Sequence, residues 1–522
     1  MSKAPSPDRD QTEVEAFLSD PGSYRPRPER VDRLDTHGAM VFLAGDEVWK
    51  IKRAVDFQFM DFSTLAKREA VCRREIEVNR TWAPDLYLDC VPITRAAGGG
   101  LEIGGQGAAV EWAVHMRRFP QEALLAWIAG HQGVSSALAR ELADTVFDGH
   151  ELAQRIDGHD ASAAMRRLAE ALSNNIAHRS DILPPDLADR FRAAVLRQQA
   201  RVSELMTTRA REGFVRRCHG DSHLGNIVLW NGKPMLFDAI EFDEDVARID
   251  TLYDLAFLLM DLDHRGFRAA SNTVLNRYLW RSGALRDIDG LAALPFYLGL
   301  RAGVRAMVTA ERAAQKAARK DDEQDRITAR GYLKAALDYL DPGPPRLIAV
   351  AGLSGTGKST LAARLAPGLA PAPGAVHLRS DLERKKLFGA AETDRLGPDA
   401  YTVAAAASVY ETLLEKARRA IAAGHSVVVD AVYARPGERL QLEKMADALG
   451  TPLSGQWLSA AQDTLASRVA QRRNDASDAT VEIVRQQRDY DIGELSAAWT
   501  VIDAGRDIET TARQAEAVLA GR

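Results

Sequence analysis

The sequence predicts two domains of different class, an α+β domain followed by an α/β domain with a parallel sheet. Three observations predict this. The chain has 522 residues, more than the roughly 250–300 at which one hydrophobic core stops growing. Its first part shows strand patterns followed by mostly helical ones, whereas its last part alternates strands with helices. A proline-rich segment separates the two patterns.

The separating segment is Leu340-Asp-Pro-Gly-Pro-Pro345, which follows a helical pattern and precedes an apolar run. Proline and glycine cannot continue a helix, and Pro-Pro favours an extended spacer. We therefore place a linker at 341–346, between a first domain at 30–340 and a second at 347–522. Residues 1–29 are expected to form an N-terminal tail that is partly disordered.

Composition and net charge limit the cellular location and the binding partners that the sequence predicts. With 46% apolar and 27% charged residues the chain resembles ordinary soluble proteins, and its formal net charge of −5 gives no overall attraction to nucleic acid or acidic membranes. Apolar runs are too short to cross a bilayer, and the N-terminus lacks the apolar segment of a signal peptide. We expect a cytoplasmic protein without a membrane or nucleic-acid partner.

In the first domain, Ala39–Ala44 and Glu47–Lys52 are β-like runs separated by Gly45-Asp46, which predicts a hairpin. Two further short strands flank Asn231-Gly232. Helical patterns are expected around 65–81, 122–209 and 252–339.

In the second domain, five apolar runs alternate with helical stretches. This order is typical of a parallel sheet covered by helices on both faces. The expected strands are Leu347–Ala351, Val376–Leu378, Ser426–Asp430, Leu453–Leu458 and Thr500–Asp503.

Residues 352–359 carry the clearest motif, Gly-Leu-Ser-Gly-Thr-Gly-Lys-Ser, between a predicted strand and an apolar helix. Such glycines let backbone N–H groups turn toward phosphate oxygens, and the helix N-terminus adds its positive end. Lys358 can reach the β and γ phosphates of ATP, and the Ser359 hydroxyl can hold Mg²⁺. The expected nucleotide-binding residues are Gly352, Ser354, Gly355, Thr356, Gly357, Lys358, Ser359 and Thr360.

Two aspartates are expected beside this phosphate loop. Asp381 follows the second predicted strand, at the sheet edge where open α/β folds bind ligands, so it could deprotonate an attacking hydroxyl. A helix cap is the alternative role for Asp381. Asp430 ends the run Val427-Val-Val-Asp, where an acid can support Mg²⁺. Arg384, one helical turn after Asp381, could bind the substrate or a phosphate, and a solvated surface position is the alternative.

Arg468, Arg472 and Arg473 recur at helical spacing after a predicted strand. Guanidinium groups suit the charge of a transferring phosphoryl group, so Arg468 and Arg472 are catalytic candidates. A solvated helix face is the alternative. The polar segment at 475–479 that follows is typical of a mobile lid.

Residues 345–522 resemble the small P-loop kinases related to gluconate kinase, zeta-type toxins and chloramphenicol phosphotransferase. The phosphate loop, the Arg-Ser-Asp-x-x-Arg segment at 379–384 and the Ser-Asp-Ala stretch at 477–479 carry the resemblance. It implies a P-loop NTPase fold and an ATP-dependent kinase, and it does not name the acceptor.

The first domain carries a second constellation. Residues 219–226 read His-Gly-Asp-Ser-His-Leu-Gly-Asn, the H-x-D-x-x-x-x-N pattern of protein-kinase catalytic loops. In that pattern Asp221 takes the proton of the acceptor hydroxyl, and Asn226 binds Mg²⁺. Asp238, past the short hairpin, is expected to supply a second carboxylate for the metal.

Lys50 and Lys52 lie on one face of a predicted strand, because side chains alternate along a strand. One of them should reach the α and β phosphates of ATP. Lys50 is favoured because apolar residues flank it on both sides, and Lys52 is the alternative. Glu75, in the next helix, is the candidate ion-pair partner, with a plain surface position as its alternative.

Residues 30–340 resemble the aminoglycoside phosphotransferase family, a branch of the protein-kinase-like fold. The resemblance implies that His219 is structural and that Asp254 supports the catalytic loop. The chain departs from protein kinases, because it lacks G-x-G-x-x-G before the lysine and has only Thr36-His-Gly-Ala39 as a phosphate-covering turn. It also lacks Asp-Phe-Gly, so a small-molecule acceptor is favoured over a protein. If Arg301 and Arg305 line the acceptor pocket, the acceptor is anionic; otherwise they are solvated or paired with acids.

The fusion resembles a bacterial arrangement of these two domains on one chain. We therefore expect a bifunctional phosphotransferase that acts on hydroxyl groups of small molecules, with one Mg-ATP site per domain. The alternative is that one domain is a nucleotide-sensing module that controls a single kinase. A toxin-like kinase and a nucleic-acid end kinase are further alternatives, and the oligomeric state is left open.

Overall fold

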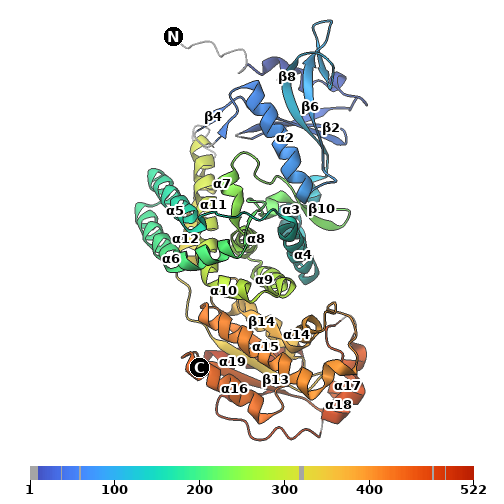
Figure 1. Ribbon diagram of the computed structural model, residues 1–522, viewed down its shortest axis with the longest axis vertical. Coiled ribbons are helices and arrows are strands. Elements are labelled where there is room, and N and C mark those ends of the chain that lie inside the picture. Colours follow the sequence, from blue (N-terminus) through green and yellow to red (C-terminus); the bar gives the residue numbers. More distant parts are fainter. Residues whose placement is uncertain are drawn as a thin grey trace. The chain divides into compact units, whose positions relative to one another are not determined.

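The computed structural model describes residues 10–36, 38–57, 60–316, 322–472, 475–487 and 489–521. The chain forms two compact units (Figure 1). The first contains the chain up to residue 164 together with 210–258, and the second contains 165–209 together with 259 onward. The helical part at 259–340 thus groups with the second domain, whereas the sequence placed the boundary at 341–346.

A six-stranded antiparallel sheet forms the core of the first unit, in the order β1-β2-β3-β8-β6-β7. The predicted hairpin is confirmed: β2 and β3 are joined by Gly45-Asp46, and Gly45 has a φ of 63°. The sequence predicted no strand between 82 and 121, where the structure has three. The strands are β1 Val31–Asp35, β2 Ala39–Ala44, β3 Glu47–Lys52, β4 Asp56–Phe57, β5 Met60–Asp61, β6 Tyr87–Arg95, β7 Leu101–Ile103, β8 Ala109–Arg117, β9 Val215–Arg217, β10 Ile227–Trp230, β11 Lys233–Leu236 and β12 Arg248–Asp250.

The second predicted hairpin, β10–β11, is also confirmed. Trp230 pairs with Lys233, and the two turn residues Asn231 and Gly232 have φ values of 51° and 79°. Two consecutive positive φ angles are what a tight type I′ hairpin turn requires. The helices of this unit are α1 Thr12–Ser19, α2 Leu65–Trp82, α3 Leu125–Gln132, α4 Ser136–Leu152 and α7 Glu244–Ala247.

Helix α1 corrects the expectation of a tail at 1–29. Val14 and Leu18 are buried in the same apolar cluster as Met40 and Phe42 of the sheet. The Gln11 side chain donates hydrogen bonds to the Lys52 carbonyl and to Glu111, each at 2.7 Å. Residues from Gln11 onward are therefore part of the folded unit, because their apolar face covers the sheet.

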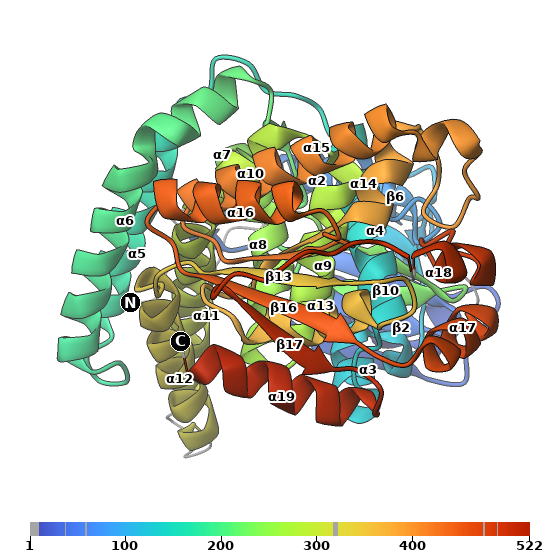
Figure 2. The same ribbon diagram turned by 90° about the horizontal axis from the view of Figure 1, so that it is seen from below.

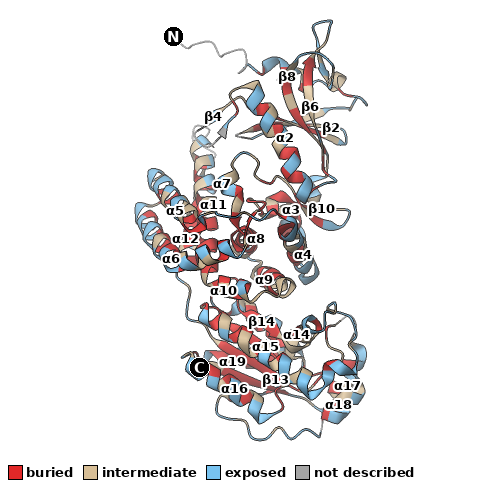
Figure 3. Cartoon of the chain, in the orientation of Figure 1, coloured by how far each residue is buried: buried red, intermediate tan, exposed pale blue. Residues whose placement is uncertain are grey.

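The second unit contains long helices and the parallel sheet. Among the described residues, one helical stretch, Leu285–Lys316, is long and apolar enough to cross a membrane. Of its most apolar window 72% is buried, as in the core helix of a soluble protein (Figure 3). Three helices, α5, α6 and α8, run from one unit into the other along the chain. The helices before the sheet are α5 Ala161–His178, α6 Pro185–Arg211, α8 Thr251–His264, α9 Arg268–Ser282, α10 Leu285–Gly290, α11 Leu294–Lys316 and α12 Glu323–Leu340.

All five strands predicted for the second domain are present and parallel, in the order β14-β15-β13-β16-β17. Figure 2 shows the sheet between two helical layers, with α15 and α16 on one face and α13 and α19 on the other. The elements are β13 Leu347–Gly352, α13 Lys358–Leu365, β14 Val376–Arg379, α14 Ser380–Leu387, α15 Val403–Ala422, β15 Val427–Asp430, α16 Pro436–Ala448, β16 Leu453–Ser459, α17 Gln462–Gln471, α18 Val481–Gln487, β17 Trp499–Asp503 and α19 Ile508–Ala520.

Candidate active sites

Strand β3 and helix α2 bring two lysines to one glutamate. The Lys50 Nζ lies 2.8 Å from Glu75 Oε1, and the Lys52 Nζ lies 2.6 Å from Glu75 Oε2. Lys50 also contacts Asp238 at 2.7 Å, whereas Lys52 pairs with Glu241. Of the two lysines, Lys50 is thus the one bonded to a candidate metal ligand. Glu75 is fully buried, which argues against the alternative of a surface position.

The charges of this cluster stabilise one another. Burial by itself raises the pKa of a carboxyl group, yet Lys50 holds the pKa of Asp238 at about 2. Burial would lower the pKa of Lys50, but Asp238 and Glu75 raise it well above its usual value. Burial raises the pKa of Glu241, the one carboxyl group here that sequence reasoning did not single out. The first site is thus a network of paired charges.

The catalytic loop is held in a defined conformation. Asn226 Nδ2 donates to Asp221 Oδ2 at 2.8 Å, which joins the proposed base to the proposed metal ligand. Gly220 has a φ of 86°, and a Cβ there would lie 2.9 Å from the Ile240 side chain, so the position requires glycine. The Phe237 amide donates to the Asn226 carbonyl at 2.9 Å, which places Asp238 beside the loop.

Asp254 lies behind the catalytic loop, in the supporting position that the resemblance implied. Its carboxylate accepts hydrogen bonds from the amides of Gly220 at 2.8 Å and His219 at 3.3 Å, and His150 Nε2 lies 3.0 Å away. Burial lowers the pKa of His219, whose Nε2 lies 3.0 Å from the Phe237 carbonyl. His219 therefore holds the loop as a neutral side chain.

Two side chains that sequence reasoning missed set the position of Asp238. Asp238 has a φ of 61°, an uncommon value for a residue other than glycine. Its amide donates to the Tyr87 hydroxyl at 3.1 Å, and the next amide, of Ala239, donates to Asn79 Oδ1 at 2.8 Å. Tyr87 begins a strand that the sequence did not predict, so no local signal pointed to it.

In the second unit, the loop between β13 and α13 has the geometry of a phosphate cradle. Gly352, Gly355 and Gly357 have φ values of 137°, 88° and 89°, which turn successive backbone N–H groups. A Cβ at Gly355 would lie 2.7 Å from the Leu465 carbonyl oxygen. The loop borders a cavity of about 170 Å³ that Ser354, Lys358, Ser359 and Thr360 help to line. These residues fit a nucleotide phosphate.

Lys358 contrasts with Lys50. Its Nζ donates to the Leu353 carbonyl at 3.1 Å, and burial lowers its pKa. Asp381 and Arg384 of α14 line the same cavity, as expected of acceptor-binding residues. Asp430 ends β15 and is buried, with His377 Nε2 3.5 Å and Arg379 Nε 3.8 Å away.

Of the two arginines proposed for the phosphoryl group, only Arg472 lines the cavity. Arg468 instead donates to the carbonyls of Ala504 at 2.8 Å and Arg506 at 2.9 Å, which corrects its expected role. The helical spacing failed because α17 ends at Gln471 and Arg472 is extended, with a ψ of 135°. Arg473 and His37 lie outside the described residues.

Several residues around this cavity had no motif to reveal them. Lys385, only 1% exposed, pairs with Asp478 at 2.7 Å and so ties α14 to the polar segment expected as a lid. Tyr401 also donates to Asp478, and the Arg384 guanidinium lies 5.0 Å from the Tyr401 ring centre. Gln487 of α18 contacts the phosphate loop directly.

Helix α9 supports the edge strand of the parallel sheet. The Asn276 side chain accepts from the His377 amide at 2.7 Å and donates to the Ala375 carbonyl at 3.1 Å. Trp280 Nε1 donates to the Leu382 carbonyl of α14 at 3.2 Å. A free sheet edge exposes unpaired backbone groups, so α9 both covers this edge and holds the helix that carries Asp381.

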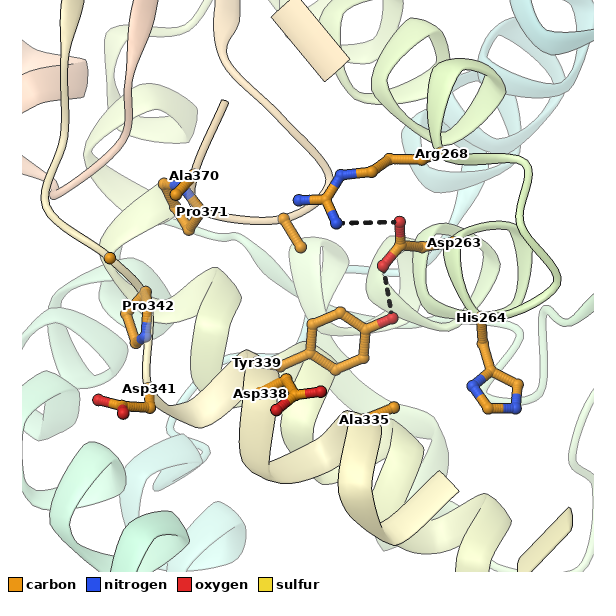
Figure 4. Close-up of a pocket in the computed structure, with 12 residues that line it drawn as sticks. Asp263, His264, Arg268, Ala335, Asp338, Tyr339, Asp341, Pro342, Ala370 and Pro371 are labelled. Atoms are coloured by element: carbon orange, nitrogen blue, oxygen red, sulfur yellow. Dashed lines mark hydrogen bonds and ion pairs between the residues drawn. The ribbon is translucent and has the colours of Figure 1, made fainter. Parts of the chain in front are cut away.

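A second cavity, of about 320 Å³, lies at the linker, and its lining shares no residue with that of the phosphate-loop cavity (Figure 4). Asp263 accepts from the Tyr339 hydroxyl at 2.7 Å and lies 3.6 Å from Arg268, so its carboxylate is already paired.

The two arginines expected to bind an anionic acceptor lie in the second unit. Arg301 is buried, and Arg305 lies 5.8 Å from the Tyr332 ring centre. Neither arginine is among the residues that line the two cavities, so an anionic acceptor stays a prediction.

Comparisons with known proteins agree with this division. Residues 47–294 match the phosphotransferase enzyme family, and residues 347–490 match an AAA domain family. The chain is 31% identical over 476 residues to a protein of Mycobacterium tuberculosis and to one of Mycobacterium bovis, both described as uncharacterized. Each match covers 89% of this chain and 91% of the relative.

Solved structures with partial similarity include two kinases. A choline/ethanolamine kinase family protein from Mesorhizobium loti is 15% identical, covering 63% of this chain and 95% of that one, with a TM-score of 0.37. A sugar kinase from Janibacter sp. is 17% identical, covering 34% and 95%, with a TM-score of 0.26. Scores this low carry no argument, so the assignment depends on the family matches and the topology. The chain belongs to the family of these mycobacterial proteins, and it is a kinase-type enzyme that joins an aminoglycoside-phosphotransferase-like domain to a P-loop domain.

Proposed function

We propose that the protein is a bifunctional ATP-dependent phosphotransferase that acts on hydroxyl groups of small molecules in the cytoplasm. The observation that carries the proposal is that two separate side-chain sets, one in each unit, each combine a phosphate-binding lysine with a carboxylate suited to act as a base. The sets share no residue and lie on unrelated scaffolds.

In the first site, Asp221 accepts the proton of the acceptor hydroxyl as the oxygen attacks the terminal phosphorus of ATP, whose bond to the β,γ-bridging oxygen breaks to release ADP. Asn226 positions the Asp221 carboxylate through the 2.8 Å hydrogen bond. Lys50 binds the α and β phosphates, and Asn226 and Asp238 would hold Mg²⁺. The bound ion would neutralise charge on the β and γ phosphates.

In the second site, the backbone donors of 352–359 hold the phosphates, and Lys358 neutralises their charge. Asp381 accepts the proton of the second acceptor, and Arg472 stabilises the charge of the transferring group. Ser359 would hold Mg²⁺, with Asp430 supporting the ion through water. The low pKa of Asp430, which His377 favours against the effect of burial, suits that role.

The test is a screen of small-molecule acceptors with γ-labelled ATP, run on the full chain and on two site variants. We expect Asp221→Asn to abolish one labelled product and Lys358→Ala to abolish another. A fall of about 10²–10⁴-fold in each is typical when a general base or charge-stabilising group is lost. Unchanged turnover in both variants would refute the proposal.

The second candidate function is a nucleotide-sensing module that controls a single kinase. Helix α9 lies within residues 47–294, which match the phosphotransferase family, and it contacts β14 and α14. These contacts favour this function, because a shift of α9 would move the helix that carries Asp381. In that case one of the two variants abolishes no product of its own, and it changes the rate of the other reaction instead.

A further inference from the structure

Helix α18 reaches the phosphate loop through its last residue. Gln487 is 7% exposed, and its Oε1 accepts a hydrogen bond from the Ser354 amide at 2.8 Å. The direction of this bond fixes the side-chain amide, because only the oxygen can accept from a backbone N–H. The Nε2 group is therefore left as a donor.

Helices α17 and α18 both rest on the first half of the loop. Leu353 packs against a cluster formed by Leu465, Val469 and Val484. Gly355 lies so close to α17 that a Cβ would approach the Leu465 carbonyl. Helices α17 and α18, which flank the polar segment at 475–479, thus contact three consecutive loop residues, 353–355. The hydrogen bond of Gln487 to Ser354 is the polar contact among them.

The Ser354 amide and the Leu353 carbonyl belong to one peptide group. Lys358 Nζ donates to that carbonyl at 3.1 Å, while Gln487 accepts from that amide. Lys358 is the residue that reaches the β and γ phosphates in such loops. The peptide between Leu353 and Ser354 therefore marks the end of the loop where the terminal phosphate of a bound ATP would lie.

Gln487 lines the same cavity as Lys358, Asp381 and Arg472. Among the residues that the structure describes, no hydrogen-bond acceptor is recorded for its Nε2 group. The Nε2 group is thus available to donate into the cavity, and a phosphate oxygen is a strong acceptor. The cavity is where such an acceptor would enter.

We propose that Gln487 binds the terminal phosphate of ATP through Nε2, while its Oε1 holds the Ser354 peptide. This rests on the proposed function of the 352–359 loop as an ATP site and adds a residue that makes the site distinguish ATP from ADP. Because the hydrogen bond reaches only the third phosphate, its loss weakens ATP binding selectively.

The test measures the dissociation constants of Mg-ADP and of the β,γ-imido analogue of ATP by calorimetry. The full chain carries Asp238→Asn to weaken the first site, and Lys358→Ala in that background gives the residual signal. We expect Gln487→Ala to weaken the ATP analogue about tenfold and to leave ADP within about twofold, as for a hydrogen bond to a charged group. Gln486→Ala is the matched control, because Gln486 is exposed on the same helix and should change neither constant.

Retained ADP binding also shows that the variant loop is folded. Equal weakening of both nucleotides would reduce Gln487 to a latch between α18 and the loop and would overturn the proposal. Unchanged affinity for both would overturn it as well. If the parent chain showed no Lys358-dependent binding of either nucleotide, the proposed function of the loop would fail first.

Discussion

The two candidate sites differ in how their lysines are paired. In the first, Lys50 is bonded to both Glu75 and Asp238, which come from elements far apart in the chain. In the second, the backbone donors belong to one continuous loop, and Lys358 contacts a carbonyl oxygen of that loop. Paired charges stabilise the fold around the first site, whereas Lys358 of the second site has no carboxylate partner among the described residues. The fold should therefore lose Lys358 more cheaply than Glu75.

The largest expected difference between the two sites is in the free energy of unfolding after a charged residue is removed. Glu75→Ala leaves two buried lysines short of a partner, and we expect it to lower the free energy of unfolding of the first unit by about 3–5 kcal/mol. Lys358→Ala breaks no carboxylate pair and should cost less than about 1 kcal/mol. Urea unfolding followed by hydrogen exchange, which resolves β3 from β13, measures both.

Glu77→Ala is the matched control for Glu75, because Glu77 lies on the same helix with its side chain 68% exposed. It should change stability by less than about 0.5 kcal/mol. Equal losses for Glu75→Ala and Lys358→Ala would erase the contrast between the sites.

Acid should destabilise the second unit through His425. This residue is fully buried, and neither ring nitrogen has a hydrogen-bond partner among the described residues. Burial lowers its pKa to about 4, so between pH 6.5 and 4 the unfolded chain binds a proton that the folded chain does not. The contribution of His425 to the free energy of unfolding is fully present above pH 6.5, and the free energy of unfolding falls by about 3 kcal/mol as the pH is lowered toward 4.

His425→Leu should flatten that part of the stability curve, as measured by urea unfolding of the second unit at several pH values. The slope between pH 6.5 and 4 is the quantity to compare with the unsubstituted chain. An unchanged slope would mean that His425 is charged or solvated in the folded state.

The contacts of α9 with β14 should contribute about 1–3 kcal/mol to the free energy of unfolding of the second unit. Asn276→Ala leaves the His377 amide, which α9 covers, without its acceptor, and an amide that loses its partner away from water costs about that much. Hydrogen exchange at His377 should accelerate accordingly. Thr273→Ala is the control, because among the described residues its hydroxyl bonds to the Ala269 carbonyl of its own helix and to no other group. The same acceleration in that variant would contradict a specific role for Asn276.

The smallest effect concerns alkaline pH. Burial lowers the pKa of Lys358, whereas Asp238 and Glu75 raise that of Lys50. As pH rises into the alkaline range, Lys358 loses its proton before Lys50 does, so nucleotide affinity should fall at the second site before the first. A loss of about tenfold corresponds to 1.4 kcal/mol. Titrations with a fluorescent ATP analogue in each site-variant background test the order, which would reverse if Lys50 deprotonated first.

The sequence by itself determined the features that local patterns encode. The phosphate loop at 352–359, the five parallel strands and both hairpins follow from spacing and turn residues such as Asn231-Gly232, which need no distant partner. The catalytic loop at 219–226 could also be recognised from the sequence, because its residues lie close together in the chain.

Only the tertiary structure decided which side chains meet. It bonded Lys50 rather than Lys52 to Asp238, turned Arg468 toward the carbonyls of Ala504 and Arg506, and brought Gln487 to the phosphate loop. These contacts join residues 36 to 188 positions apart in the sequence. No local periodicity records such distances, because they are set by how strands order in a sheet and where helices such as α17 end.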